Sequence, residues 1–433
     1  MKKLLALVLA LTMILALAAC GAKTTEPAAT PAADGETAAP AESTALSDLK
    51  VGFIFLHDEN STYDLNFLNA AKACCEALGL KSEQFIFKTN IPEGQECYEA
   101  AAELADAGCS IIFADSFGHE DYMIQAAKEF PEVQFCHATG TKAHTENLSN
   151  YHNAFASIYE GRYLAGIAAG MKLNEMIAAG DFTADEAKIG YVGAYTYAEV
   201  ISGYTSFFLG ARSVCPTATM EVTFTGSWYD ETAEKEAANK LIANGCKLIS
   251  QHADSMGAPT ACETAGVPNI SYNGSTLSAC PKTFIVSSRI DWEPYFEYMV
   301  NCVAEGKAID TDWTGTLATG SVVLTEVNEA AAAAGTVEAI DAAKAALEAG
   351  TLHVFDAANF TVSVIDPAKF INGNAKTDAD KRVTSYMADV DTDPAYTGDT
   401  EAIVDGHFSE SDFRSAPYFD LQIDGITLLD TAL

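Results

Sequence analysis

Short apolar runs alternate with segments of helical spacing over most of the chain. Residues 51–56 form a continuous apolar run, which is typical of a strand buried on both faces of a parallel sheet. Residues 68–78 then repeat apolar side chains at helical spacing, and Gly79 follows as the expected end of that helix. The same reasoning predicts further strands at 84–88, 110–114, 133–136, 188–192, 221–224, 247–250, 269–271 and 283–286. It predicts further helices at 97–107, 121–130, 156–171, 199–212, 230–243, 261–265, 292–302 and 328–349.

This alternation runs through the chain in two successive series. A strand–helix–strand repeat produces a parallel sheet that is covered by helices. Two series therefore predict an α/β fold with two doubly wound parallel-sheet lobes. Ligands of such folds bind beyond the carboxyl ends of the strands, so two facing lobes create an interlobe cleft.

The N-terminus has the pattern of an export signal. Lys2 and Lys3 precede an apolar run over residues 4–19, which is shorter than the roughly 20 residues of a membrane span but suits a secretory signal. The run ends at Cys20 and resembles a bacterial lipoprotein signal, so residues 1–20 are the expected signal peptide and Cys20 the lipidated residue. An ordinary signal peptide with an incidental cysteine is the alternative. Residues 21–48 are rich in Ala, Thr, Pro and Glu and predict a flexible linker that tethers the protein to the extracytoplasmic face of the cell membrane.

Composition narrows the function classes. The chain has 433 residues, with 25 Lys and Arg against 60 Asp and Glu, for a net charge of −35. Such a surface repels polyphosphate, which excludes a nucleic-acid binder. The single membrane-type stretch excludes a multi-span permease. Of the 11 cysteines, those after Cys20 lie mostly in helical or strand patterns, which favours buried thiols over disulfides.

The loops that follow the predicted strands carry aromatic and polar side chains in unusual density. Aromatic faces suit a planar or ring-shaped ligand, and carboxylates, hydroxyls or amides hydrogen-bond its edge. The alternative is that these aromatic residues belong to the core or anchor their loops. The candidate ligand-binding residues are Asn60, Tyr63, Asp64, Ser116, Phe117, Tyr195, Trp228, His252, Asp254 and Asn273.

Several longer stretches resemble one family. These stretches are Ile112–Gly118, Phe135–Gly140, Tyr159–Gly170, Lys188–Gly193, Leu209–Val214, Trp228–Asp230 and Gln251–Ser255. They are similar to the basic membrane protein (BMP) family of substrate-binding lipoproteins, which are the partners of nucleoside-type ABC importers. The resemblance covers roughly residues 48–355. It implies a type I periplasmic-binding-protein fold, in which two hinged lobes joined by crossover strands close on a purine nucleoside or base.

The resemblance also implies roles for individual residues. Tyr63 and Trp228 match the two aromatic positions that sandwich the purine in the nucleoside-binding branch. Asp64 falls where the family often has an amide that touches the base. Asn273 replaces the ribose-binding aspartate, and Ile290 replaces a lysine on the ribose side. The residues that stack on the purine are therefore better preserved in this sequence than those that bind the ribose. A free purine base remains an alternative ligand.

The resemblance divides the chain into lobes. The N-terminal lobe is expected at 49–155 plus about 284–310, and the C-terminal lobe at 156–283 plus about 311–360. Residues 361–433 are acidic, mix short strand-like runs with turns, and are expected to form an appendage packed on one lobe.

Three other functions stay open. A sugar receptor would stack its ligand on the same aromatic residues, and a surface sensor would use the same fold. A nucleoside or sugar hydrolase would need an acid–base pair, for which His252 and Asp254 lie two residues apart. The chain lacks the nucleophile, zinc and phosphate-loop motifs of common enzyme classes, so a binding protein without cofactor is favoured over an enzyme.

A calcium loop is a further alternative in the acidic appendage. Asp389, Asp391 and Asp393 have the first spacings of such a loop, but Pro394 and Thr400 stand where Gly and Glu are expected. The sequence therefore predicts a receptor whose partners are a small-molecule purine ligand, ABC permease and ATPase subunits, and the membrane through its lipid anchor.

Overall fold

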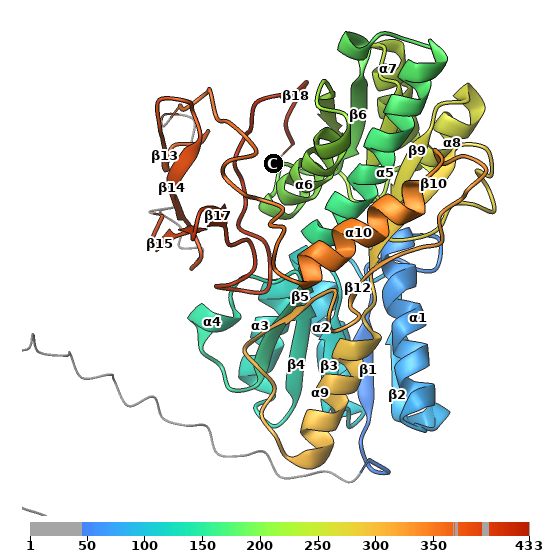
Figure 1. The fold of residues 1–433 in the computed structure, drawn as a ribbon. Coiled ribbons are helices and arrows are strands. Elements are labelled where there is room, and N and C mark those ends of the chain that lie inside the picture. The colour runs from blue at the N-terminus through green and yellow to red at the C-terminus, as the bar shows by residue number, and fades with distance from the viewer. Residues whose placement is uncertain (1–45, 367, 369–370, 392–397, 433) are drawn as a thin grey trace, which may run out of the picture. The chain divides into compact units, whose positions relative to one another are not determined.

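The first of two large sheets contains parallel strands only. The computed structural model describes residues 46–366, 368, 371–391 and 398–432 (Figure 1). Six strands pair in the order β11-β5-β4-β3-β1-β2, and every neighbouring pair is parallel. The strands are β1 (Val51–Ile54), β2 (Phe85–Lys88), β3 (Ile111–Ala114), β4 (Gln134–Ala138), β5 (Tyr151–Ala156) and β11 (Asp312–Gly315). The helices that accompany them are α1 (Thr62–Ala77), α2 (Gln95–Asp106), α3 (Glu120–Glu129), α4 (Ala143–Glu146) and α9 (Glu293–Glu305). We call this sheet with its helices the first lobe.

The alternation of side chains along β1 explains how helices cover both faces of this sheet. Phe53 belongs to the apolar cluster that contains Phe67 of α1 and Phe296 of α9. Its neighbour Ile54 belongs to the cluster that contains residues of α2 and α3. Successive side chains of a strand point to opposite faces, so a continuous apolar run is buried on both sides.

The second sheet has the same construction. Seven strands pair in the order β12-β10-β9-β8-β6-β7-β18, and β12 alone is antiparallel to its neighbour. The strands are β6 (Lys188–Gly193), β7 (Thr219–Phe224), β8 (Leu248–Gln251), β9 (Asn269–Tyr272), β10 (Phe284–Ile290), β12 (Val322–Leu324) and β18 (Ile426–Leu428). The helices are α5 (Ile158–Ala179), α6 (Ala198–Val214), α7 (Glu231–Ala243), α8 (Gly257–Ala265) and α10 (Thr336–Glu348). This sheet with its helices is the second lobe.

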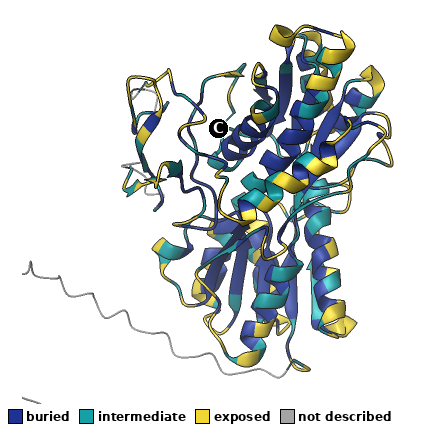
Figure 2. Cartoon of the chain, viewed as in Figure 1, coloured by how far each residue is buried: buried dark blue, intermediate teal, exposed yellow. Residues whose placement is uncertain are grey.

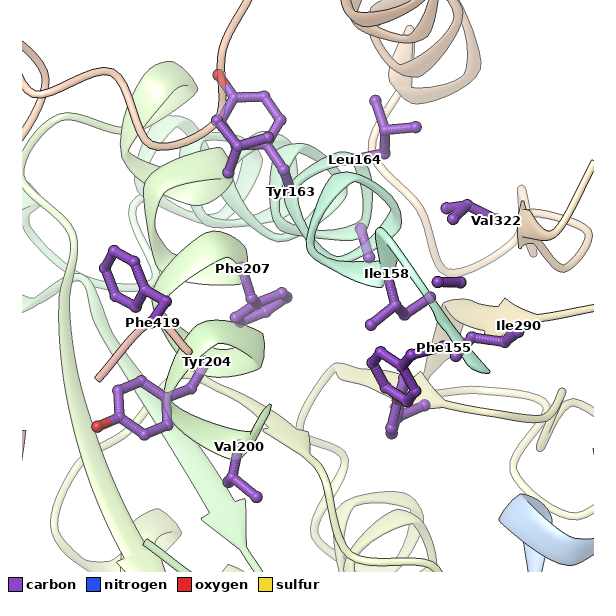
Figure 3. Packing of buried hydrophobic residues seen from close by; sticks show 14 of the residues in the cluster. Phe155, Ile158, Tyr163, Leu164, Val200, Tyr204, Phe207, Ile290, Val322 and Phe419 are labelled. Atoms are coloured by element: carbon purple, nitrogen blue, oxygen red, sulfur yellow. The ribbon is translucent and has the colours of Figure 1, made fainter. Parts of the chain in front are cut away.

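Helices α5 and α6 pack with their backbones in direct contact. A Cβ atom at Gly166 would collide with the carbonyl oxygen of Phe207, and one at Gly210 would collide with that of Tyr163. Both positions therefore require glycine. Tyr163, Tyr204 and Phe207 belong to one apolar cluster around this contact (Figure 3).

The chain passes between the sheets after β5, after β10 and after β11. Two of these strands lie in a different sheet from the one expected. The expected N-terminal lobe included 284–310, but β10 pairs with β9 of the second sheet. The expected C-terminal lobe included 311–360, but β11 pairs with β5 of the first sheet. The apolar pattern of a strand shows that it is buried but not in which sheet it lies.

Residues beyond α10 form the appendage, which is drawn from orange to red in Figure 1. Its strands are β13 (Ala375–Thr377), β14 (Val383–Ala388), β15 (Thr400–Glu401), β16 (Ile403–Val404) and β17 (His407–Phe408), and β18 joins the second sheet. The expectation that it packs on one lobe is wrong. Ser415 donates from its backbone N–H and its hydroxyl to Asp312 of the first lobe, at 2.9 and 2.8 Å.

Burial follows the predicted pattern. Figure 2 shows the central strands of both sheets buried, while exposed residues lie mostly on outward helix faces and in loops. The ten cysteines from Cys74 to Cys302 are free and buried, which confirms the prediction of buried thiols. No helix among the described residues has the length and apolarity of a membrane span. The predicted signal peptide with Cys20, most of the linker, and Asp393 of the calcium loop lie outside the described residues.

Candidate functional site

A cavity lies where loops of the two lobes meet. Its walls come from segments that follow the carboxyl ends of the parallel strands in both sheets, as the fold predicts. The lining residues from the first lobe are Leu56, His57, Tyr63, Asp64, Ser116, Phe117 and Thr139. Those from the second lobe are Glu199, Trp228, His252, Asp254 and Tyr272. We call this the inner cavity.

Contacts between the lobes surround the inner cavity. Thr62 donates from its backbone N–H and from its hydroxyl to the carbonyl oxygen of Asp254, at 3.1 Å each. The rings of His57 and Tyr229 lie 5.4 Å apart between centroids. These contacts join the β1–α1 loop to two loops of the second lobe, so ligand in this cavity would be enclosed by both lobes.

The start of helix α1 positions Asp64. Ser61 is the N-cap residue, and its hydroxyl accepts a hydrogen bond from the backbone N–H of Asp64, as is usual for serine at this place. The Asp64 carboxylate accepts from the backbone N–H of His57 at 2.7 Å, and the His57 Nδ1 atom lies 3.4 Å from it. Burial opposes ionisation of Asp64, but the hydrogen bonds from His57 and Ser61 outweigh it and lower its pKa. Asp64 is therefore a fixed, ionised acceptor.

The pKa of Asp115, which lies next to Asp64, is shifted in the opposite direction. Asp115 is fully buried, and one of its carboxyl oxygens accepts from the backbone N–H of Leu56 at 3.0 Å. Burial, followed by the charge of Asp64, raises its pKa well above the ordinary value. Its carbonyl oxygen accepts a 2.7 Å hydrogen bond from the hydroxyl of Tyr63, which holds the Tyr63 ring at the cavity wall.

The β3–α3 loop supplies Ser116 and Phe117. The Ser116 hydroxyl donates to Glu93 at 2.6 Å, and the same carboxylate oxygen accepts from the backbone N–H of Gly118 at 2.8 Å. His137 of β4 donates from Nε2 to the carbonyl oxygen of Ser116 at 2.7 Å. The loop is thus held on both sides, and Phe117 projects between the lobes to lie 5.3 Å from the Tyr197 ring of the second lobe.

In the second lobe, two loops hold each other in place. The backbone N–H of Asp254 donates to the carbonyl oxygen of Trp228 at 3.0 Å. Glu234 of α7 accepts from the backbone N–H groups of Asp230 and Ser255. Burial, with the charges of Asp64 and Glu234 next, raises the pKa of Asp254 well above its ordinary value, which favours its protonated form.

His252 and Tyr272 complete the wall. The Nε2 atom of His252 lies 3.4 Å from Glu199, and burial lowers the pKa of the imidazole. The hydroxyl of Tyr272 has no hydrogen-bond partner among the described residues, and Arg162 covers its ring at 4.4 Å. The imidazole of His252 is directed to Glu199, whereas the hydrolase alternative would need it to pair with Asp254.

The ionisable side chains that line the inner cavity include acids but neither Lys nor Arg among the described residues. The acids are Asp64, Glu199 and Asp254. A phosphate or carboxylate group would meet no opposite charge there, so the cavity fits a neutral or cationic ligand.

Most predicted site residues line the inner cavity, and three do not. Asn60 is exposed and donates to Asp58 at 2.7 Å, so it shapes its own loop. Tyr195 packs beside the lining residue Trp228, with ring centroids 5.0 Å apart. Asn273 accepts from Asn66 at 3.4 Å and lines a separate groove on the surface of both lobes.

Several lining residues were not predicted. His57 and Tyr272 lie in the loops that the sequence singled out, beside the residues chosen there. Glu199 is the second residue of α6, just beyond the predicted loop, and Thr139 follows β4 at a left-handed φ of 65°. No cluster of metal-ligating side chains occurs among the residues that the structure describes.

Comparisons with known proteins agree with this geometry. The family model of ABC transporter substrate-binding proteins described as PnrA-like matches residues 79–350. A purine-binding protein of Brucella abortus is 35% identical over 261 residues, which are 60% of this chain and 69% of that protein. A Haloferax volcanii protein named as an ABC transporter glucose-binding protein is 35% identical over 225 residues, which are 52% of this chain and 54% of that protein.

A solved structure shows the same fold. An ABC transporter solute-binding protein from Aeropyrum pernix K1 superposes with a TM-score of 0.60 at 17% identity, covering 71% of this chain and 93% of the other. Together with the two parallel sheets, this likeness confirms the predicted type I periplasmic-binding-protein fold.

Proposed function

The chain belongs to the Bmp family of ABC transporter substrate-binding proteins, and we propose that it captures a purine base or nucleoside in the inner cavity. The observation that carries the proposal is the lining itself. Aromatic rings come from both lobes, one ionised carboxylate is fixed at the edge, and neither Lys nor Arg is present among the described lining residues. The relative that is named for purine binding supports the same ligand class.

The predicted site residues that line the inner cavity each have a role in this proposal. Tyr63 of the first lobe and Trp228 of the second stack on the two faces of the purine. Asp64 accepts hydrogen bonds from the N–H groups at its edge. Ser116, Phe117, His252 and Asp254 complete the wall. Because ligand contacts both lobes only when they are closed, binding shifts the hinge equilibrium toward closure.

Membership of this family indicates an ABC transporter as the protein partner. An extracytoplasmic substrate-binding protein of this kind delivers its ligand to an ABC transporter, and the family is one of binding proteins rather than enzymes. We further propose that Cys20 carries a lipid anchor and that residues 21–48 form the tether. Mass spectrometry of membrane-extracted protein tests this, because lipidated Cys20 would be the first residue of the mature chain.

A thermal-shift comparison tests the ligand class. Ligand at 100 times its Kd stabilises the native state by about 2.7 kcal/mol, which raises the melting temperature of a protein of this size by about a few degrees. We expect adenine, adenosine or guanosine to raise the melting temperature, and glucose or ribose to leave it unchanged. A shift with sugars alone would contradict the purine assignment and leave the fold and family intact.

Sugar binding is the second candidate. The Haloferax relative named for glucose binding is as similar in identity as the purine-binding relative, and aromatic rings with carboxylates also suit a pyranose. The same thermal-shift comparison separates the two functions.

A further inference from the structure

The appendage lies outside the part of the chain that the family model matches, which ends at residue 350. It is firmly attached to the second lobe. Strand β18 pairs with β7. The carbonyl oxygen of Ala432 accepts a hydrogen bond from the backbone N–H of Thr196 at 2.7 Å, and the backbone N–H of Ala432 donates to the Thr196 hydroxyl at 3.0 Å. The hydroxyl of Ser202 in α6 donates to the buried carboxyl of Glu410 at 2.5 Å. Phe419 joins the apolar cluster of Tyr204 and Phe207 (Figure 3).

The same appendage reaches the first lobe through the bonds from Ser415 to Asp312. It therefore spans both lobes beside the inner cavity and borders a second space of about 660 Å³, which is partly open to solvent. We call this space the outer chamber. Its walls are Thr139, Thr141, Lys142 and Phe117 of the first lobe, Thr196–Glu199 and Ile201 of the second, and Ile371, Arg414, Ala416, Pro417, Asp420 and Gln422 of the appendage.

The two spaces share part of their walls. Phe117, Thr139 and Glu199 line both the inner cavity and the outer chamber. These three residues therefore form the boundary between the two spaces, and the outer chamber is the space next to the inner cavity on the side of the appendage. Asn273 and Ile290 do not line the inner cavity: Asn273 lines the separate groove, and Ile290 is 1% exposed within β10.

The charged side chains of Lys142, Arg414 and Asp420 in the outer chamber already have hydrogen-bond or ion-pair partners. The Lys142 ammonium lies 2.5 Å from Asp121, and the Arg414 guanidinium donates to the carbonyl oxygens of Val390, Ala416 and Pro417. Asp420 accepts from the hydroxyl of Tyr386. Beyond these pairs the wall is largely apolar, with the rings of Phe117 and Tyr197 and the side chain of Ile201, and it also carries threonine and tyrosine hydroxyls and one amide. An apolar wall with a few hydroxyl and amide groups suits a neutral group that has its own hydroxyls.

We propose that the outer chamber is a second ligand subsite, which takes a neutral, hydroxyl-bearing group attached to the planar ring in the inner cavity. For a nucleoside this group is the sugar. The inference rests on the proposed function and adds to it that the appendage, rather than the side of Asn273 and Ile290, forms the sugar-side wall.

Filling the outer chamber tests this inference. Ala198 is the first residue of α6 and lines only the outer chamber, so Ala198→Trp occupies its space and Ala198→Ser is the matched small control. Lys142→Trp fills it from the first lobe, and Lys142→Met is its control, which also removes the charge. Calorimetric titration of the full chain with adenine and with adenosine gives the two affinities for each variant.

Both tryptophan variants should bind adenine within about twofold of wild type and adenosine at least tenfold more weakly. Retained adenine binding also shows that a variant is folded. Both small controls should bind both compounds normally. If either tryptophan variant keeps adenine and binds adenosine as wild type does, the sugar lies in the inner cavity and the inference is wrong. The same holds if the wild type binds adenine but not adenosine. If the wild type binds neither compound, the proposed function fails, and this inference fails with it.

Discussion

Asp64 and Asp115 show how neighbouring carboxyl groups acquire different states. The Asp64 carboxylate accepts a hydrogen bond from His57, and its interactions with His57 and Ser61 lower its pKa, so it stays ionised despite its burial. Asp115 is buried beside that charge, and its second oxygen has no hydrogen-bond partner among the described residues. Because like charges repel strongly in a buried setting, only one of the pair is readily ionised. The cavity therefore presents a single well-defined acceptor at this edge.

The role of Asp64 leads to a prediction. Replacing its charge-assisted hydrogen bond to a purine N–H with a neutral one, as in Asp64→Asn, should weaken adenine binding about tenfold. Asp58→Asn is the matched control, because Asp58 lies in the same loop and accepts from Asn60 outside the cavity. Titration calorimetry at pH 7 measures both. Equal affinity of Asp64→Asn and the wild type would remove Asp64 from the ligand contact.

Residue identity alone could not separate lining side chains from supporting ones. Tyr195 and Trp228 both follow strands of the second sheet, yet Trp228 lines the cavity and Tyr195 packs against its edge. Their ring-to-ring geometry depends on how two loops pack against each other, which no local pattern records. Glu199 was missed because it belongs to the first turn of a helix rather than to the loop before it.

At the scale of elements, the sequence predicted most buried strands from their apolar runs and missed β5. This strand contains His152 and Asn153, both buried, which interrupt its apolar pattern. His152 is bonded to Gln134 and Asp310, and Asn153 donates to Glu120. The partners that make a polar strand residue tolerable come from distant segments. The last predicted helix is shorter than expected, because Gly335 at a φ of 81° precedes its start at Thr336.

The attachment of the appendage to α6 predicts a pH dependence. Burial raises the pKa of Glu410 to about 7, against an ordinary value of 4.5. Between these pH values the folded protein holds this proton and the unfolded chain does not, so stability falls as the pH rises through that window. Glu410→Gln retains the acceptor for Ser202 and cannot ionise.

Denaturant unfolding at pH 5 and pH 8 measures this effect. The free energy of unfolding of the wild type should fall by up to about 3 kcal/mol more than that of Glu410→Gln over this range. Glu329→Gln, which changes an exposed carboxylate, should behave like the wild type. Parallel pH profiles for all three proteins would show that Glu410 does not hold a proton in the folded state.

At the scale of the whole molecule, two parallel sheets place their carboxyl ends around one cavity. That arrangement follows from strand–helix alternation and was predictable from sequence. The sequence did not predict which sheet contains β10 and β11, or that the appendage contacts both lobes. These features depend on long-range packing, which sets the pairing partners. The appendage adds a wall to the site from a segment without strong periodicity.

In the proposed complex, a purine is held between one aromatic residue of each lobe. The direct measurement is calorimetric titration of wild type and Trp228→Ala with adenine and adenosine, with Trp313→Ala as a control that removes a tryptophan of the first lobe outside the cavity. Stacking on an aromatic ring contributes about 1–3 kcal/mol per base. We predict that the wild type and Trp313→Ala bind at least one of the two compounds equally well and that Trp228→Ala binds it at least tenfold more weakly. Binding by Trp228→Ala as tight as that of the wild type would show that the purine does not stack on Trp228.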